Sequence, residues 1–259
     1  MNDLKNEPIL RVRGLTRAFG GVVAVNDVSF EVYPGEIYGL IGPNGAGKTT
    51  VINMLSGLLA PGGGTVEFRG QRIERLPAHR IAELGIARTY QNIRLFGGMS
   101  VLRNVIVGKH ARLRAGLVER LVFSPRVRRE EARARDEAMS LLRSAGLEGV
   151  ARHRASALSY GDQRRLELVR ALASEPQLLL LDEPAAGLNA AESQALRDRL
   201  RRLADGGLAL LVIEHDMALV MGLCDRIGVL NFGNLIAEGT PAEISSNPEV
   251  VEAYLGRDS

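Results

Sequence analysis

The sequence predicts an α/β fold in which a mostly parallel sheet is covered by helices and interrupted by a helical insert. Two short apolar runs, residues 178–181 and 209–213, are typical of strands that are buried on both faces. Residues 189–204 between them have the pattern of a helix, so this part of the chain predicts a strand–helix–strand unit with parallel strands. A third apolar run, residues 37–41, leads into a glycine-rich loop that precedes another helix.

Further elements are predicted in the N-terminal third. Apolar residues alternate with polar or charged ones over residues 10–13 and 28–32, which is the pattern of half-buried strands. The second of these strands ends at a Pro-Gly turn signal, just before the apolar run. A helix is predicted from Lys48 to about Pro61, and a strand over residues 64–68.

The middle of the chain predicts helices. Between residues 128 and 145 the apolar residues share one helix face: Ala134, Ala138, Leu141, Leu142 and Ala145. Gly146 is a plausible stop for this helix, and a second helix is expected over residues 159–174. Asn189 with Glu192 three residues later predicts a capped start for the helix between the two buried strands.

Composition excludes several classes of protein. The chain has 259 residues, long enough to bury a core that is stable without disulfides. It has one cysteine, Cys224, so no internal disulfide can form. The four histidines are not clustered, which argues against a structural metal site. No run of 18 apolar residues occurs, so no membrane-spanning helix is expected. Residues 1–8 are polar, so no signal peptide is expected either.

Charge is unevenly distributed along the chain. The whole sequence has a net charge of +3, but residues 109–154 carry 12 basic and 6 acidic side chains, so the rest of the chain is slightly negative. This basic insert has two interpretations, which the sequence leaves open. It is a solvated helical face, or it attracts an anionic lipid surface or an acidic partner.

One segment predicts phosphate binding. Residues 42–49 match the pattern G-x-x-x-x-G-K-[ST] between a predicted strand and a predicted helix, the context that this pattern requires. Backbone N–H groups of such a loop bind phosphate oxygens, the lysine reaches the β- and γ-phosphates, and the hydroxyl after it binds Mg²⁺. The alternative is an accidental glycine turn. The expected nucleotide-binding residues are Gly42, Pro43, Asn44, Gly45, Ala46, Gly47, Lys48, Thr49 and Thr50.

Two neighbouring carboxylates follow a buried strand. Asp182 and Glu183 come directly after the run 178–181, and the carboxyl end of a parallel strand faces the crevice where ligands bind. Asp182 is expected to hold Mg²⁺ through its water shell, and Glu183 is a candidate general base for an attacking water. The alternative is a solvated acidic turn before Pro184.

Together with four further features, these motifs make the chain resemble the ATP-binding cassette (ABC) ATPases from Phe19 to Leu255. The segment Leu158-Ser159-Tyr160-Gly161-Asp162-Gln163 is similar to the family's signature sequence, usually written LSGGQ. Gln91 matches the glutamine of the Q-loop, His215 the switch histidine, and Phe19 the aromatic residue that stacks on adenine. The resemblance implies a P-loop NTPase cassette with a RecA-like, mostly parallel sheet flanked by helices, an antiparallel β part and a helical subdomain.

The resemblance also implies a mechanism. ATP and Mg²⁺ are the expected cofactors, and two cassettes pack head to tail so that Ser159 and Gly161 of one meet the γ-phosphate bound by the other. Glu183 would deprotonate water, while Lys48 and His215 stabilise charge on the transferring phosphoryl group. Gln91 is expected to be a catalytic residue. It is also expected to bind the metal ion together with Thr49 and Asp182. It also opens residues 92–96, which in the family touch the membrane subunits.

Each of the four further features has a simpler interpretation. Phe19 could be a core aromatic, Gln91 a surface amide and His215 a histidine that merely ends a strand. Ser159 with Asp162 also forms an ordinary helix cap, which is compatible with phosphate binding. The combination of all the motifs in the family's order favours the functional interpretation.

The sequence departs from the family pattern in ways that narrow the subgroup. Tyr160 and Asp162 replace a Gly and a Gln of the signature, Arg164 replaces a second Gln, and Asn189 replaces the Asp of the D-loop. The stretches LSYGDQRRLE, DEPAAGLN and NPEVVEAYLG are similar to the branched-chain (hydrophobic) amino-acid importers, and the basic insert resembles that of the longer of their two ATPase subunits. The ATPases of urea and amide importers resemble most of these sequence stretches as well.

This resemblance implies three parts, namely a first half of the ATPase core over residues 1–92, a helical subdomain over 93–164 and a second half over 165–259. The implied partners are a second ABC ATPase subunit, identical or different, transmembrane permease subunits and, indirectly, a solute-binding protein, with no nucleic acid. The implied location is the cytoplasmic face of the inner membrane.

Three competing functions are kept. The first is the ATPase of a lipopolysaccharide-type exporter, whose signature resembles LSGGE. The second is an ABC protein that acts on nucleic acid or the ribosome, although the paired cassettes, zinc cysteines and long coiled coils typical of that class do not occur here. The third is a regulatory module that binds nucleotide without hydrolysing it, against which Glu183 and His215 argue.

Overall fold

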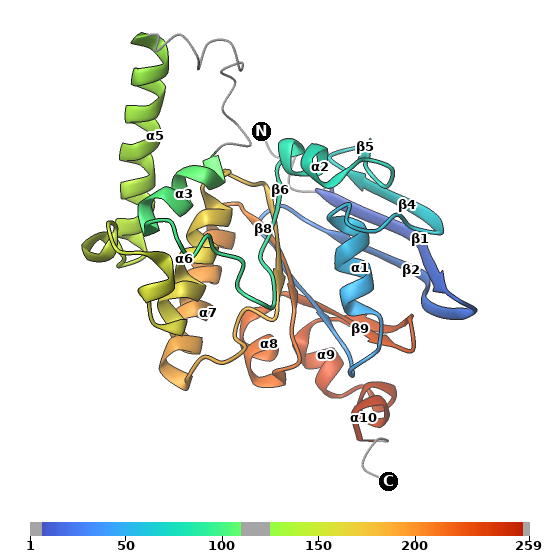
Figure 1. Cartoon of the computed structure of the whole chain (residues 1–259). Helices are drawn as coiled ribbons and strands as arrows, with labels where there is room; N and C mark the ends of the chain where they lie inside the picture. The colour runs from blue at the N-terminus through green and yellow to red at the C-terminus, as the bar shows by residue number, and fades with distance from the viewer. Residues whose placement is uncertain (1–6, 110–124, 256–259) are drawn as a thin grey trace. The chain divides into compact units, whose positions relative to one another are not determined.

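The computed structural model describes residues 7–109 and 125–255, drawn in colour in Figure 1. The described residues before Asn92 and after Pro176 form one compact unit, and those within residues 92–176 form the other. One helix, residues 160–172, continues across residue 164, and the second unit extends to residue 176. The division into residues 1–92, 93–164 and 165–259 stays a prediction. The basic insert predicted for residues 109–154 lies partly outside the described residues.

The described part of the first unit contains an antiparallel sheet and a mostly parallel sheet. The antiparallel sheet has the order β2-β1-β4-β5, with bounds β1 Leu10–Phe19, β2 Val22–Val32, β4 Gly63–Phe68 and β5 Gln71–Arg72. The second sheet has the order β10-β9-β3-β8-β7-β6, and only β10 in it runs antiparallel to its neighbour. Its strands are β3 Ile37–Ile41, β6 Ile86–Arg88, β7 Leu178–Asp182, β8 Ala209–Ile213, β9 Arg226–Asn231 and β10 Asn234–Gly239. The predicted α/β fold is confirmed.

Helices connect these strands (Figure 1). Their bounds are α1 Lys48–Leu55, α2 Ala78–Leu84, α7 Ala190–Asp205, α8 Met217–Leu223, α9 Pro241–Ser245 and α10 Pro248–Leu255. The predicted cap of α7 is confirmed, since Asn189 Oδ1 accepts the N–H of Glu192 at 3.0 Å and Glu192 Oε2 accepts the N–H of Asn189 at 3.0 Å.

The boundary predicted for α1 was wrong. The helix ends at Leu55 instead of near Pro61, and Gly57 shortly after it has a left-handed φ of 71°. A Cβ at Gly57 would lie 2.9 Å from the backbone nitrogen of Ala78, so the turn also needs a residue without a side chain. The strands predicted over residues 10–13 and 28–32 are parts of the longer β1 and β2.

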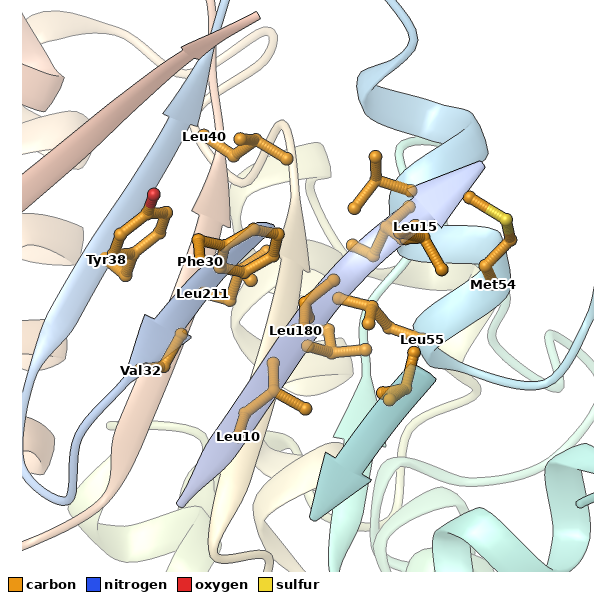
Figure 2. Close-up of a cluster of buried hydrophobic side chains, with 14 of the residues drawn as sticks. Leu10, Leu15, Phe30, Val32, Tyr38, Leu40, Met54, Leu55, Leu180 and Leu211 are labelled. Carbon is orange, nitrogen blue, oxygen red and sulfur yellow. The ribbon is translucent and has the colours of Figure 1, made fainter. Parts of the chain in front are cut away.

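The core of the first unit joins the two sheets and α1. Figure 2 shows their buried side chains pointing toward one another: Leu10, Leu15, Phe30 and Val32 from the antiparallel sheet, Tyr38, Leu40, Leu180 and Leu211 from the other, and Met54 and Leu55 from α1. Phe30 and Tyr38 stack with ring centroids 5.1 Å apart. Full burial of each large apolar side chain contributes about 1.5–3 kcal/mol, so this packing fixes α1 firmly against the strands.

The second unit is helical in its described part. It consists of α3 Val101–Lys109, α5 Pro125–Ser144, the 3-10 turns η3 Glu148–Val150 and η4 Ala155–Ala157, and α6 Tyr160–Leu172. The apolar face predicted on the middle helix is confirmed, because Ala134, Ala138, Leu142 and Ala145 are buried and Leu141 is half-buried. Gly146 follows α5 with a φ of 72°. Within residues 7–109 and 125–255, no helix is both long and apolar enough to cross a bilayer.

Candidate functional site

Parallel strand order brings the predicted motifs of the first unit to one edge of its sheet. Strands β3, β6, β7 and β8 run in the same direction, so their carboxyl ends share that edge. The residues that follow these strands begin at Gly42, Thr89, Glu183 and Glu214 respectively. Segments distant in the sequence thus supply one site.

The phosphate loop depends on two glycines. Gly42 has a φ of 149° and Gly47 a φ of 105°, backbone conformations that residues with side chains rarely adopt. A Cβ would lie 2.1 Å from the carbonyl oxygen of Leu230 at Gly42, and 2.4 Å from that of Ala24 at Gly47. Gly45 is exposed with a φ of 82° and open space around it. Neighbouring backbone therefore fixes both ends of the loop while its middle stays accessible.

Lys48 begins α1 and turns back over this loop. Its Nζ donates hydrogen bonds to the carbonyl oxygens of Gly42, at 2.6 Å, and Pro43, at 3.0 Å. The turn between β9 and β10 supports the loop from outside, since the N–H of Gly233 donates to the carbonyl oxygen of Ala46 at 3.0 Å. The ammonium group is thus held within the loop that is predicted to bind phosphate. Thr49 is exposed in the first turn of α1 and Thr50 is half-buried.

The two predicted carboxylates lie at the end of β7 and directly after it. Asp182 is its last residue and is buried, and Arg88 Nη2 donates to Asp182 Oδ2 at 2.9 Å. Glu183 has a left-handed φ of 47°, and its N–H donates to the carbonyl oxygen of Ile213 at 2.9 Å. The alternative of a merely solvated acidic turn is wrong for Asp182.

Gln91 and His215 both approach Glu183. Gln91 Nε2 donates to Glu183 Oε2 at 2.7 Å, and His215 Nδ1 lies 3.6 Å from Glu183 Oε1. The imidazole is more than half exposed, whereas the carboxylate is mostly covered. A carboxylate placed between an amide donor and an accessible imidazole can orient a water molecule and accept its proton.

Two further residues of this edge are absent from the predicted set. Arg88 binds Asp182 as described, and Glu214 is buried, accepting the N–H of Ala185 at 2.9 Å and that of His215 at 3.2 Å. Burial raises the pKa of the Glu214 carboxyl. Glu214 thereby connects the loop after β7 with the loop after β8. The sequence signal for both is a charged residue at the end of an apolar strand segment.

Phe19 ends β1 and is 46% exposed, so the alternative of a core aromatic is wrong. The guanidinium of Arg17 lies over its ring, 5.0 Å from the centroid. An aromatic ring that is about half exposed can stack on a planar ligand.

The second unit contains the segment that resembles the family signature. Ser159 is the N-cap of α6, and its Oγ accepts the N–H of Asp162 at 3.2 Å and donates to Asp162 Oδ2 at 2.9 Å. The predicted helix cap is confirmed. Arg164 Nε donates to the hydroxyl of Tyr160 at 3.2 Å, and Gly161 is buried in the first turn.

The described residues contain no group of three or more His, Cys, Asp or Glu side chains placed to bind a metal ion together. Hydroxyl, amide and carboxylate oxygens are nevertheless present on Thr49, Gln91 and Asp182. Mg²⁺ commonly uses only one or two carboxylates and completes its shell with water and substrate phosphates. Oxygens of these types suit Mg²⁺, and the carboxylate of Asp182 is buried at the end of β7, on the edge that also carries the phosphate loop.

Comparison with known proteins identifies the family of this chain. The family model described as ABC transporter matches residues 25–186, and the model described as branched-chain amino acid ATP-binding cassette transporter matches residues 234–259. The high-affinity branched-chain amino acid transport ATP-binding protein LivG of Escherichia coli (strain K12) is 49% identical over 97% of this chain and 99% of its own length. Its counterpart BraF of Pseudomonas aeruginosa is 44% identical, with the same coverage of both chains.

A solved structure extends the comparison to the fold. The ADP conformation of an ATP-binding cassette of an ABC transporter is similar with a TM-score of 0.85 and 30% sequence identity, covering 97% of this chain and all of that one. ABC ATPases bind ATP and hydrolyse it to power transport. This chain belongs to the ABC transporter family of ATPases, in the group of branched-chain amino acid transport ATP-binding proteins.

Proposed function

We propose that this chain powers the uptake of branched-chain or other hydrophobic amino acids by hydrolysing ATP at the edge formed by β3, β6, β7 and β8. The observation that carries the mechanism is the position of Glu183, which accepts a hydrogen bond from Gln91 and lies 3.6 Å from His215. The amino-acid substrate is supported by the names of relatives that cover nearly the whole chain.

The proposed residue roles follow from this geometry. Glu183 orients water and takes its proton, while Gln91 holds the second oxygen of the carboxylate in place. Lys48 and His215 stabilise the negative charge that develops on the phosphoryl oxygens. Because Lys48 is already held over the loop by two carbonyl oxygens, its charge needs little rearrangement to serve this purpose.

Different residues are proposed to bind the nucleotide and the metal ion. The open middle of the phosphate loop, Lys48 and the exposed Phe19 ring fit the phosphates and the base of ATP. Thr49, Gln91 and Asp182 supply oxygen ligands or bind the ion's water shell. Mg²⁺, when bound there, neutralises charge on the β- and γ-phosphates.

The proposed complex contains more than this chain. Ser159 and Gly161 would meet the nucleotide held by a second ATPase subunit, identical or different, and residues 92–96 would touch permease subunits at the cytoplasmic face of the membrane. A solute-binding protein would deliver the amino acid to the permease. In this arrangement nucleotide-driven closure of two ATPase subunits is converted into movement of the permease.

Affinity purification from native membranes tests the assembly. The tagged full-length chain carrying Glu183→Gln is extracted in mild detergent with ATP and Mg²⁺, and Lys48→Ala serves as the matched control. Co-purification of two permease subunits and a second, shorter ATPase subunit is expected by mass spectrometry. Recovery of outer-envelope assembly proteins would favour an exporter instead, and recovery of ribosomes without any permease would contradict a role in transport.

A further inference from the structure

Arg88 forms a buried ion pair with the carboxylate that is proposed to serve the metal. Its Nη2 donates to Asp182 Oδ2 at 2.9 Å, and both side chains are only 8% exposed. Arg88 is the last residue of β6, and Asp182 is the last residue of the neighbouring parallel strand β7. Strand pairing therefore places the guanidinium beside the carboxylate.

The same guanidinium is also anchored to α1. Its Nη1 donates to Asn53 Oδ1 at 2.7 Å and to Ser56 Oγ at 2.9 Å. Arg88 thus connects the strand that carries Asp182 with the helix that begins at Lys48. A planar guanidinium held at two of its nitrogens can neither rotate freely nor follow the carboxylate if that group turns.

This arrangement leaves the two oxygens of Asp182 in different states. Oδ2 accepts a charge-assisted hydrogen bond from a fixed donor, so Oδ1 is the oxygen left for a cation or its water shell. A cation that took both oxygens would have to approach Oδ2 beside the fixed guanidinium, whose positive charge opposes it, so the carboxylate offers a cation one oxygen more readily than two. Mg²⁺ requires near-octahedral geometry and suits such a single oxygen, whereas Ca²⁺ takes more ligands and accepts both oxygens of one carboxylate.

We infer that Arg88 is a positioning residue that sets the preference of the site for Mg²⁺ over Ca²⁺ by occupying one oxygen of Asp182. This inference rests on the proposed place of Asp182 at the metal site. Both cations carry the same charge, so removal of the nearby positive charge changes their two affinities by similar factors. A change in the ratio of the two affinities therefore shows whether Asp182 can offer a cation both of its oxygens.

The test measures this ratio in Arg88→Met and in the wild-type chain. Mn²⁺ bound to the full-length chain with the non-hydrolysable analogue AMP-PNP is displaced by Mg²⁺ or by Ca²⁺, and free Mn²⁺ is followed by electron paramagnetic resonance. The ratio of Ca²⁺ affinity to Mg²⁺ affinity is expected to rise about tenfold, the usual scale for loss of a side chain that orients a metal ligand. In the Asp182→Asn background the same substitution should leave the ratio unchanged.

Two further variants separate orientation from folding. Arg88→Lys keeps a charge and a donor but loses the planar fork, so we expect a smaller rise, and this variant serves if Arg88→Met does not fold. Ser56→Ala removes a bond on the side of α1 and leaves the Asp182 pair intact, so the ratio should stay at its wild-type value. Thermal unfolding of each variant checks its fold.

The possible failures are distinguishable. If Asp182→Asn alone leaves both metal affinities unchanged, the proposed metal role of Asp182 is wrong. If Asp182→Asn weakens both metals but neither Arg88 variant changes the ratio, the site stands and the role inferred for Arg88 is wrong. An equal rise of the ratio with and without Asp182 would also overturn it, because Arg88 would then act by another route.

Discussion

Gln91 Nε2 donates a 2.7 Å hydrogen bond to Oε2 of Glu183, and His215 Nδ1 lies 3.6 Å from the other oxygen of the same carboxylate. Gln91 follows β6, Glu183 follows β7 and His215 follows β8. Gln91 is also the last residue before the helical unit begins at Asn92. Glu183, the proposed base, is therefore hydrogen-bonded to the residue that immediately precedes the second unit.

Glu183→Gln should abolish most turnover without loss of ATP binding. The amide has nearly the shape of the carboxylate but cannot accept the proton of water, and loss of a general base costs about 10²–10⁴-fold in rate. Phosphate release and equilibrium ATP binding are the measurements. Glu83→Gln, on the exposed face of α2, is the matched control and should hydrolyse ATP normally. Near-normal hydrolysis by Glu183→Gln would refute the assignment of the base.

Lys48→Ala should act on binding. Its ammonium is held within the phosphate loop by the carbonyl oxygens of Gly42 and Pro43, where it is positioned to meet phosphate oxygens. Loss of a charge-assisted contact to phosphate, about 1.5–3 kcal/mol, should weaken ATP affinity by about one to two orders of magnitude. Arg75→Ala removes one positive charge at an exposed position outside the phosphate loop and is the control. Unchanged ATP affinity in Lys48→Ala would count against the proposed role of the loop.

Gly47→Ala should damage the loop more than an ordinary glycine substitution does. The new Cβ would lie 2.4 Å from the carbonyl oxygen of Ala24 at a φ of 105°, so the backbone must move. Gly70→Ala, at a φ of 75° with open space, experiences only the conformational cost, about 1 kcal/mol. Chemical denaturation and nucleotide binding of both variants check this. Equal losses of stability, with ATP affinity retained in both, would contradict the role of Gly47.

Cys224 should be unreactive in the folded chain. Burial raises the pKa of this thiol to about 12, so it stays protonated near neutral pH and has little nucleophilic thiolate. Iodoacetamide at about pH 8 should label the unfolded chain readily and the native chain hardly at all, as mass spectrometry can measure. Rapid labelling of the native protein would contradict this burial.

The raised pKa of the Cys224 thiol also makes the stability of the fold depend on pH. The unfolded thiol ionises near its ordinary pKa of 9.0, while the folded thiol stays neutral until about 12. The contribution of Cys224 to stability is therefore fully present below the unfolded pKa and is lost as pH rises toward the folded one. Cys224→Ala should remove this part of the alkaline loss in denaturation measured across that range.

The sequence predicted correctly those elements that are determined by residues close together in the chain. The capping residues Asn189 and Glu192, the glycine-rich loop before Lys48 and the apolar runs of β7 and β8 are recognisable from neighbouring residues alone, and each predicted element forms. The end of α1 was not predicted correctly, because the turn at Gly57 depends on its close approach to Ala78, which is distant in the sequence.

The same distinction applies to the site. Gln91 and His215 were predicted from a family resemblance, since nothing in their immediate neighbours indicates that both approach Glu183. Arg88 and Glu214 were not predicted, because their partners are side chains and backbone groups of other strands and loops. Pairing across the sheet, rather than a short motif, makes these two residues part of the site.

Uptake of labelled leucine into proteoliposomes measures whether ATP hydrolysis at Glu183 drives amino-acid transport. The vesicles contain the complex recovered with this chain, ATP and Mg²⁺ on the side of the ATPase, and the solute-binding protein with leucine on the other. We expect ATP-dependent accumulation with the wild-type chain and none with Glu183→Gln, although both chains assemble and bind ATP. Accumulation that continues at the wild-type rate with Glu183→Gln, or ATP hydrolysis by the wild-type complex without any amino-acid uptake, would contradict this expectation.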